Sequence, residues 1–371
     1  MHFPDYHGGS IVNLMSSIAT ACGGRTPYAG LRILPKFQAK NIVLLIIDGL
    51  GFDYLQQADT AFLHEHLVGE MTSVFSSTTA CAIPTFLTGV APKQHAMTGW
   101  HMLLKELGTV AKILPYTARF GGSHFAIEGR ELLDTETFFE RITRKGYAVV
   151  PEEIREDKTD MFRGGKVMSY STLQGFVRQI RGTLRRRGSK YVYAYWPFFD
   201  RLVHEHGTEH AEPRKHLKEL DTALSRMVQG VSDTVFVIAA DHGFMDLDFI
   251  ELEEHPRLAE CLSLPLCGED RCVHCYVYPA RKRQFEEYVK KHLSDVCTMR
   301  TRKELLEQDF YGLFEAHPKL YGRIGDYVLV CKKQYAIRDT LLGERHKDFV
   351  ANHGGMSRDE MVVPLVVYQK I

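Results

Sequence analysis

The chain has 371 residues, of which 44% are hydrophobic and 25% are charged, the composition of an ordinary globular protein. Lysine plus arginine and aspartate plus glutamate both number 46, so no net charge attracts nucleic acid or an anionic membrane. The basic run RGTLRRRGSK at 181–190 is interpreted as a solvated helix end and turn. We expect one large α/β domain with insertions and no nucleic-acid or membrane partner.

The N-terminal segment is not typical of a signal peptide, because it has no basic start followed by an unbroken apolar run. No window offers the ~18 consecutive apolar residues that a membrane span needs. A cytoplasmic protein with reduced cysteines is therefore the prediction. The pair Cys272 and Cys275 has no second pair to complete a zinc ribbon, and the alternation in RCVHCYVY favours a strand instead.

Four apolar runs predict strands buried on both faces, as in a parallel sheet covered by helices. They are Ile42–Ile47, Tyr191–Trp196, Thr234–Ala240 and Val362–Tyr368. Pro364 lies in the last run and favours a sheet edge or a bulge there. Helical periodicity lies between the strands, over 10–21, 171–186 and 214–229. This alternation indicates a doubly wound α/β sheet, mostly parallel and flanked by helices.

Two stretches fit this core poorly and are interpreted as insertions that cap the active site. The predicted division of the chain is a first core segment over 1–100, an insertion over 101–190, a second core segment over 191–255, an insertion over 256–345 and a last core segment over 346–371.

Three of the predicted strands are each followed by an aspartate, and in one case a histidine comes directly after it. Asp48-Gly49 follows the first strand, Asp200 lies just past the second, and Asp241-His242-Gly243 follows the third. Ligands bind outside the carboxyl ends of strands in open α/β sheets. A carboxylate in such a place needs a cation or several donors, because uncompensated burial is costly.

Metal binding accounts for these residues best. Asp200 and His204 are four residues apart, which places both on one face of a helix or tight turn. His353 lies beside two glycines that allow close approach of the backbone. With Asp48, Asp241 and His242 the set is three aspartates and three histidines, the mixed ligands that zinc takes. Each motif alone also fits a helix cap, a turn or a solvated helix face.

Thr79 is the candidate nucleophile. It precedes a helix-like stretch that ends near Gly89, and a helix N-terminus offers free N–H groups to a phosphoryl oxygen. A metal ion would activate its hydroxyl. The alternative is that Thr78 or Thr79 only caps the helix. Pro84 lies inside the stretch and would kink it.

The order of the candidate ligands and the nucleophile along the chain resembles that of the alkaline phosphatase superfamily. The resemblance is strongest to its type I phosphodiesterase/nucleotide pyrophosphatase branch, in the compact bacterial form. The resemblance runs in order over most of the chain and fades in the two insertions. Its motifs are specific as a set, and they are NIVLLIIDGLG, SSTTACAIPTFLTGVAPKQHAMTGW, FFDRLVHEHG, VFVIAADHGFMD and NHGGMSRDEMVVPLVV.

The resemblance implies that the protein binds two divalent metal ions. Zinc is the metal expected first, and manganese or iron can occupy similar sites. Asp200, His204 and His353 would bind one ion, and Asp48, Asp241 and His242 the other. Thr79 would lie between them as nucleophile and shared ligand, and a phospho-threonine intermediate would form and be hydrolysed. The expected activity is hydrolysis of a small phosphoester, of the phosphodiester or nucleotide pyrophosphate kind.

The sequence departs from that family at the asparagine that holds a phosphoryl oxygen, because Trp100 stands at the matching position. The N–H of Ala80 or a residue from an insertion is expected to replace it. Trp100 is a candidate for stacking on a substrate ring, with core packing as the alternative. His101 is a candidate for the role of this asparagine, and a structural or surface histidine is the favoured interpretation. His206 and His210 are interpreted as surface residues or as residues behind the ligands.

Other activities on the same fold stay open, namely a phosphomonoesterase, a phosphonate hydrolase or a mutase, and so does an inactive binding protein. A sulfatase is disfavoured because Cys81 is not followed by the C-x-P-x-R pattern. A cofactor-independent phosphoglycerate mutase is disfavoured too, since that enzyme would use serine as nucleophile in a much longer chain.

Overall fold

The computed structural model describes the whole chain except residues 123, 126–128, 158, 345–348 and 371. A central seven-stranded sheet has the order β2-β18-β9-β1-β8-β6-β7. These strands are β1 (Asn41–Ile47), β2 (Leu67–Thr72), β6 (Lys145–Pro151), β7 (Gly165–Tyr170), β8 (Lys190–Trp196), β9 (Thr234–Ala239) and β18 (Val362–Lys370). Each residue of β1 and β8 is buried, as the apolar runs predict for strands covered on both faces.

The sheet is mostly parallel, as predicted. Strand β1 pairs in parallel with β8 and β9, and β6 pairs in parallel with β7 and β8. Strand β18 differs, because it lies between β2 and β9 and is antiparallel to both. The prediction of an edge at Pro364 is therefore wrong. The predicted bulge is confirmed, since the register shifts between Leu365 and Val366, next to the proline that lacks an N–H.

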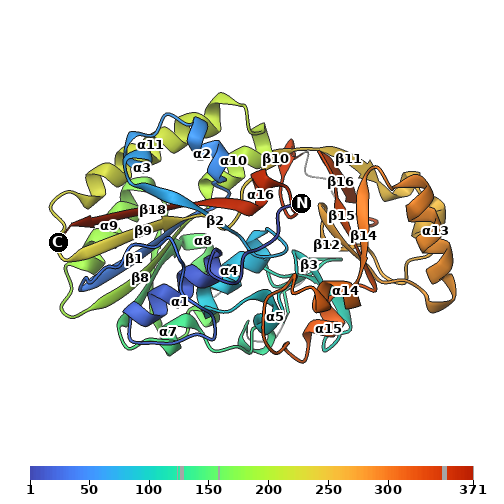
Figure 1. The fold of residues 1–371 in the computed structure, drawn as a ribbon, viewed down its shortest axis with the longest axis horizontal. Coiled ribbons are helices and arrows are strands. Elements are labelled where there is room, and N and C mark those ends of the chain that lie inside the picture. The colour runs from blue at the N-terminus through green and yellow to red at the C-terminus, as the bar shows by residue number, and fades with distance from the viewer. Residues whose placement is uncertain (123, 126–128, 158, 345–348, 371) are drawn as a thin grey trace.

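Helices cover both faces of this sheet, which gives the doubly wound layering (Figure 1). One face carries α2 (Phe52–Gln57), α3 (Ala61–Glu65), α10 (Phe198–His206) and α11 (Ala211–Val228), and the other carries α1 (Ile11–Ala21), α4 (Thr79–Thr88) and α7 (Phe138–Arg141). Helix α9 (Leu173–Leu184) packs against α11. The three predicted helices are confirmed as α1, α9 and α11. None of the helices in the described part of the chain is both long and apolar enough to cross a membrane.

A second seven-stranded sheet, in the order β14-β15-β13-β12-β3-β4-β5, lies beside the central sheet. Its strands are β3 (His101–Leu104), β4 (Thr109–Lys112), β5 (Thr117–Ala118), β12 (Cys267–Glu269), β13 (Cys272–Cys275), β14 (Cys297–Thr301) and β15 (Tyr327–Cys331). All of its pairings are antiparallel, and α13 (Lys282–His292) packs at its outer end. The strand predicted around Cys272 and Cys275 is confirmed as β13.

The remaining elements are shorter. The helices are α5 (Pro92–His95), α6 (Gly129–Leu132), α8 (Glu152–Asp157), α12 (Pro256–Ala259), α14 (Arg302–Glu307), α15 (Leu320–Arg323) and α16 (Arg358–Met361). The strands are β10 (Met245–Asp246), β11 (Asp248–Glu251), β16 (Tyr335–Arg338) and β17 (Ala351–Asn352). Single-turn 3-10 helices lie at Thr159–Phe162, Leu252–Glu254 and Pro279–Arg281.

The segment 101–190 is only partly outside the core. Its strands β6 and β7 extend the central sheet, so the expectation that this whole segment is an insertion is wrong for 145–190. The pattern failed because β7 is short and only partly buried, and so lacks the continuous apolar run of the inner strands. The domain boundaries themselves stay a prediction. The basic run forms the exposed end of α9, while Lys190 is buried at the start of β8.

Candidate metal centre

Two groups of three potential metal ligands lie at the carboxyl ends of the central strands. Asp48 follows β1, and Asp241 and His242 follow β9, where they form one group with ligand atoms within 4.8 Å of one another. The other group, with the same spacing limit, joins Asp200 and His204 of α10 to His353 after β17. The structure thus brings together all six predicted side chains, in the two predicted sets.

Helix α10 and the short strand β17 position the group formed by Asp200, His204 and His353. Asp200 and His204 lie one turn apart on α10, with Nε2 of His204 3.5 Å from Oδ1 of Asp200. Strand β17 pairs with β10, and this carries His353 in from the far end of the chain, with its Nε2 3.9 Å from the same Oδ1. Nδ1 of His204 lies 2.8 Å from the carbonyl of Ala351, an arrangement that directs Nε2 toward a metal.

The group formed by Asp48, Asp241 and His242 is packed more tightly. Nε2 of His242 lies 3.4 Å from Oδ1 of Asp48 and 3.5 Å from Oδ2 of Asp241. The Gly49 N–H donates to Oδ1 of Asp241 at 3.0 Å, and the Tyr195 hydroxyl donates to Oδ2 of Asp48. The loop needs a glycine after His242, because a Cβ at Gly243 would lie 2.0 Å from the Asp359 carbonyl oxygen.

The electrostatics of both groups fit a bound cation. Burial, followed by the nearby carboxyls of Asp200 and Asp241, raises the pKa of Asp48 well above its usual value. Burial lowers the pKa of His242 and of His353, which favours the neutral imidazoles that ligate metals. Oδ2 of Asp241 is buried without a hydrogen-bond donor among the described residues. A divalent ion would place a positive charge between the carboxyl groups of each set.

Thr79 is the first residue of α4 and lies beside the group that contains Asp48 and His242. Its hydroxyl is 3.0 Å from Nε2 of His242 and 3.4 Å from Oδ1 of Asp48. The capping role falls to Thr78, whose side-chain oxygen accepts from the N–H of Ala80 at 3.4 Å. The alternative that Thr79 itself is the cap is therefore wrong, and its hydroxyl is left for the acids and the imidazole. Helix α4 continues past Pro84 to Thr88.

The remaining predicted residues have different surroundings. Trp100 precedes β3, partly exposed, and its N–H donates to Oε1 of Glu269 at 2.6 Å. His101 is partly exposed at the start of β3, and burial lowers its pKa to about 3, in keeping with a structural role. His206 and His210 are exposed, with their rings stacked at 4.7 Å, so they are surface residues.

A buried ion pair, which the motifs did not indicate, holds the loops behind both groups. Arg271 follows β12 and donates to the two carboxyl oxygens of Glu360 at 2.9 and 2.7 Å, and both side chains are at most 1% exposed. The carbonyl of Glu360 accepts from Gly243, and its carboxyl accepts from Gly355 at 2.8 Å. One residue thus contacts the loop after His242 and the loop after His353.

A second such contact orients His353. Asp270 accepts from Nδ2 of Asn352 at 3.1 Å, and Oδ1 of Asn352 accepts from the N–H of His353 at 2.9 Å. Asp270 and Arg271 follow each other in the turn between β12 and β13, so the second sheet supports the metal centre. The only signal in the sequence was the acidic and basic cluster GEDR itself, which is also typical of a solvated turn.

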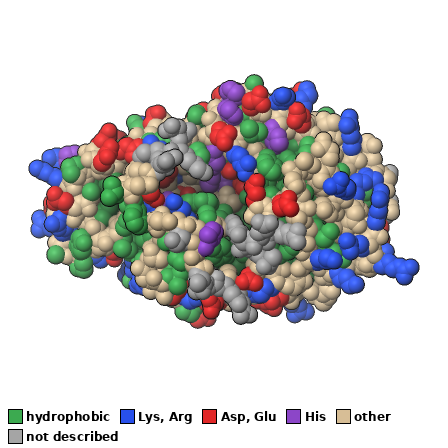
Figure 2. Space-filling view, turned by 180° about the vertical axis from the view of Figure 1, so that it is seen from behind, with side chains coloured by type: hydrophobic (Ala, Val, Ile, Leu, Met, Phe, Trp, Pro, Cys, Tyr) green, Lys and Arg blue, Asp and Glu red, His purple; other side chains and the backbone are tan. Residues whose placement is uncertain are grey.

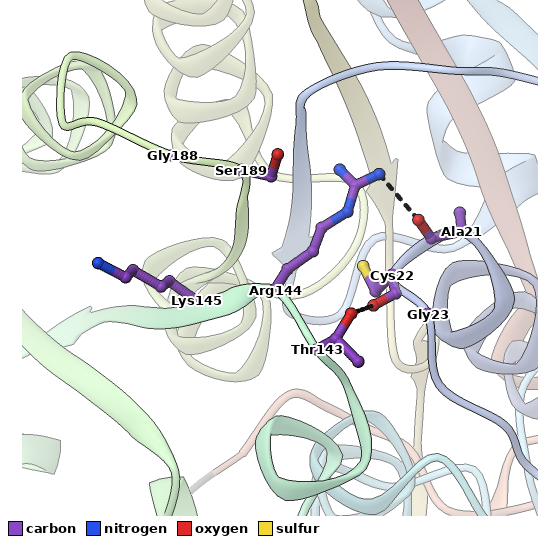
Figure 3. Close-up of a pocket in the computed structure, with 8 residues that line it drawn as sticks. All are labelled: Ala21, Cys22, Gly23, Thr143, Arg144, Lys145, Gly188 and Ser189. Carbon is purple, nitrogen blue, oxygen red and sulfur yellow. Dashed lines mark hydrogen bonds between the residues drawn. The ribbon is translucent and has the colours of Figure 1, made fainter.

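Asp200 and His204 are partly exposed, whereas the other four ligand-type residues are buried. Figure 2 shows histidine and acidic side chains around a hollow in the middle of the back face. A separate cavity of about 500 Å³ lies at the amino ends of β6 and β8, lined by the residues in Figure 3. Arg144 there donates to the Ala21 and Ala39 carbonyls at 2.8 Å, so it ties chain segments together.

The fold and the site together define an alkaline-phosphatase-like α/β protein with paired aspartate and histidine groups at its strand ends. Residues 42–356 match the type I phosphodiesterase/nucleotide pyrophosphatase family, and the chain belongs to this family of the alkaline phosphatase superfamily. The resemblance inferred from the motifs is therefore confirmed. No curated protein matches the sequence.

Solved structures with the same fold are distant in sequence. Murine ectonucleotide pyrophosphatase/phosphodiesterase 5 is 15% identical, with a TM-score of 0.70 over 88% of each chain. An inactive threonine-to-alanine variant of that murine protein in complex with AMP matches with the same identity and TM-score, over 88% of this chain and 87% of that chain. Phosphonoacetate hydrolase from Sinorhizobium meliloti 1021, in complex with phosphonoacetate, is 15% identical with a TM-score of 0.66 over 91% of each chain. These likenesses show the fold.

Proposed function

We propose that this protein hydrolyses small phosphate esters, of the phosphodiester or nucleotide pyrophosphate kind, with two divalent metal ions and Thr79 as nucleophile. One observation carries the proposal. The Thr79 hydroxyl lies at a helix N-terminus and 3.0 Å from Nε2 of His242, beside one of two three-residue groups of metal-ligand type. Membership of a phosphodiesterase family supports the same reaction class.

In this proposal Asp200, His204 and His353 hold one ion, and Asp48, Asp241 and His242 hold the other. The Thr79 oxygen is a ligand within the pair. Zinc suits the mixed nitrogen and oxygen ligands, and manganese and iron bind similar sets. When bound, the ions lower the pKa of hydroxyl and water and neutralise charge on the attacking and leaving oxygens.

The side chains of the chain then carry the reaction in two steps. Oγ of Thr79 loses its proton and attacks phosphorus, the bond from Oγ to phosphorus forms, and the bond to the leaving oxygen breaks, so that the leaving group departs and takes up a proton from solvent. The N–H groups in the first turn of α4 bind a phosphoryl oxygen, and the Ala80 N–H joins them by exchanging its long 3.4 Å hydrogen bond to Thr78 for the substrate. Water then attacks phosphorus, the bond from Oγ to phosphorus breaks, phosphate or a monoester leaves, and a proton from the water restores the Thr79 hydroxyl.

The substrate is expected to be a small molecule such as a nucleotide. The relative solved with AMP supports this class, and the relative solved with phosphonoacetate makes a phosphonate hydrolase the second candidate. The predicted cytoplasmic location is kept as part of the proposal.

The test compares hydrolysis of bis-p-nitrophenyl phosphate and p-nitrophenyl phosphate by zinc-loaded protein. We expect the diester to be preferred and Thr79→Ala to lower kcat by about 10³-fold or more, with the fold and the metal content retained. Thr79→Ser, which keeps a hydroxyl, is the matched control and should retain measurable turnover. Undiminished turnover by Thr79→Ala would overturn the role of Thr79. A preference for the monoester would indicate a phosphatase. Inactivity of the wild type on both compounds would favour a phosphonate hydrolase or an inactive binding protein.

A further inference from the structure

The side chain of Phe244 contacts three of the six ligand-type residues, and the proposed reaction has not used it. Its ring lies edge-on to the imidazole of His204, with 4.8 Å between the ring centroids, and to that of His353, with 5.2 Å, and both interplanar angles are 87°. The ring of His242 lies 5.6 Å away at 71°. His204 and His353 belong to one group and His242 to the other, so a single ring contacts both groups.

The three imidazoles also contact one another. The rings of His242 and His353 stack at 3.6 Å, and those of His204 and His353 lie 5.1 Å apart. Phe244 is therefore the common neighbour of a cluster of imidazoles that joins the two groups. Aromatic rings at these separations favour edge-to-face geometry, so the ring of Phe244 restricts the angle at which each imidazole can lie.

The position of the Phe244 ring is itself restricted by the chain. Phe244 is only 7% exposed. It lies against Gly49, the residue after Asp48, where a Cβ would lie 2.4 Å from Cε2 of Phe244. Gly49 also has a φ of +77°, so glycine suits this position both for its backbone and for the space it leaves to the ring. The ring thus packs on the loop after β1 as well as on the imidazoles.

We propose that Phe244 is a positioning residue of the metal centre, whose ring holds the three imidazoles in the orientation that binds both metal ions. The hydrogen-bond partner of a ligating imidazole directs one of its nitrogens, as the Ala351 carbonyl does for His204. The edge-on contact with Phe244 sets the tilt of the ring plane, which that hydrogen bond leaves free. This inference rests on the proposed function, because it takes the two groups as metal sites.

The test compares Phe244→Leu, which removes the ring, with Phe244→Tyr, which keeps it. Phe236→Leu is the matched control, because Phe236 is a fully buried phenylalanine within β9 whose ring contacts Tyr368. For each metal-free protein, the free energy of unfolding in urea and the affinity for zinc in a competition titration without substrate would be measured.

We expect both leucine variants to be destabilised, since each loses a buried ring. Only Phe244→Leu is expected to bind zinc more weakly, by about 10- to 100-fold at both sites, because side chains behind metal ligands change metal affinity by such factors. Phe244→Tyr is expected to stay within about threefold of the wild-type zinc affinity, since the ring is retained.

Three results would overturn the inference. Wild-type zinc affinity in Phe244→Leu would limit Phe244 to packing. Equal losses of zinc affinity in Phe244→Leu and Phe236→Leu would mean that the stability of the fold sets the affinity, and equal losses in Phe244→Leu and Phe244→Tyr would mean that the ring does not orient the imidazoles. The proposed function fails separately if the zinc-loaded wild type shows no turnover that depends on Thr79, and the zinc affinities then still decide the role of Phe244.

Discussion

At the scale of single residues, the centre is a set of acids and imidazoles whose burial is unfavourable unless a cation joins them. Asp48 and Asp241 are at most 2% exposed, and His242 is fully buried beside them. Buried carboxylates this close repel one another, so the metal-free fold carries a cost that a divalent ion would remove. The stability of this protein is therefore expected to be coupled to metal binding.

The raised pKa of Glu269 is expected to make the free energy of unfolding of the metal-free protein depend on pH. Its folded pKa of about 8 lies above the usual 4.5, so between these values the folded state holds a proton that the unfolded chain has released. The free energy of unfolding of the wild type should then fall, relative to Glu269→Gln, by a few kcal/mol as the pH rises from about 5 to 8. Urea unfolding of both proteins checks this. Parallel pH profiles would contradict it.

The residues predicted from the sequence are those that a local pattern marks. Asp48 and Asp241 follow apolar strands, and Asp200 and His204 show helical spacing, so type and position together indicated ligands. Glu269, by contrast, contacts Trp100 only because β12 pairs with β3 in the fold. Tyr195 is similar, because it lies inside an apolar run and its hydroxyl contact with Asp48 is tertiary.

At the scale of elements, the turn between β12 and β13 joins the second sheet to the metal loops. Its residues Asp270 and Arg271 contact Asn352 and Glu360, each of which also hydrogen-bonds to the chain at or near His353. The central strands could be predicted because each is one long apolar run. Most of the second sheet could not, since its strands are short and antiparallel and partner choice depends on residues far apart in the chain.

Arg271→Met tests the turn directly. It leaves the Glu360 carboxylate buried without its partner, so we expect about 3–5 kcal/mol of destabilisation and weaker zinc binding. Denaturant unfolding and a zinc competition titration measure the two effects. The control is Arg283→Met, because Arg283 is 90% exposed in its pair with Glu287 and should change neither quantity. Unaltered zinc affinity in a destabilised Arg271→Met would limit the pair to a structural role.

At the scale of the whole molecule, two sheets of different kind form the site between them. The six ligand-type residues and Thr79 lie at the carboxyl edge of the central sheet, on the loops and helices that adjoin it, and the second sheet provides the turn that supports them. Composition and periodicity predicted the doubly wound core, because long buried strands dominate both. They did not predict that β6 and β7 extend that core, since neither is marked by the uniform apolar run of β1 and β8.

The most direct test of the central claim is the number of zinc ions bound per chain, measured by elemental analysis after removal of free metal. The account predicts two ions in the wild type and about one each in Asp241→Asn and His353→Ala, which alter different groups. Asp233→Asn, at the opposite edge of the sheet, where it accepts from Lys40, should keep two. Full occupancy in Asp241→Asn and His353→Ala, or no bound metal in the wild type, would contradict the account.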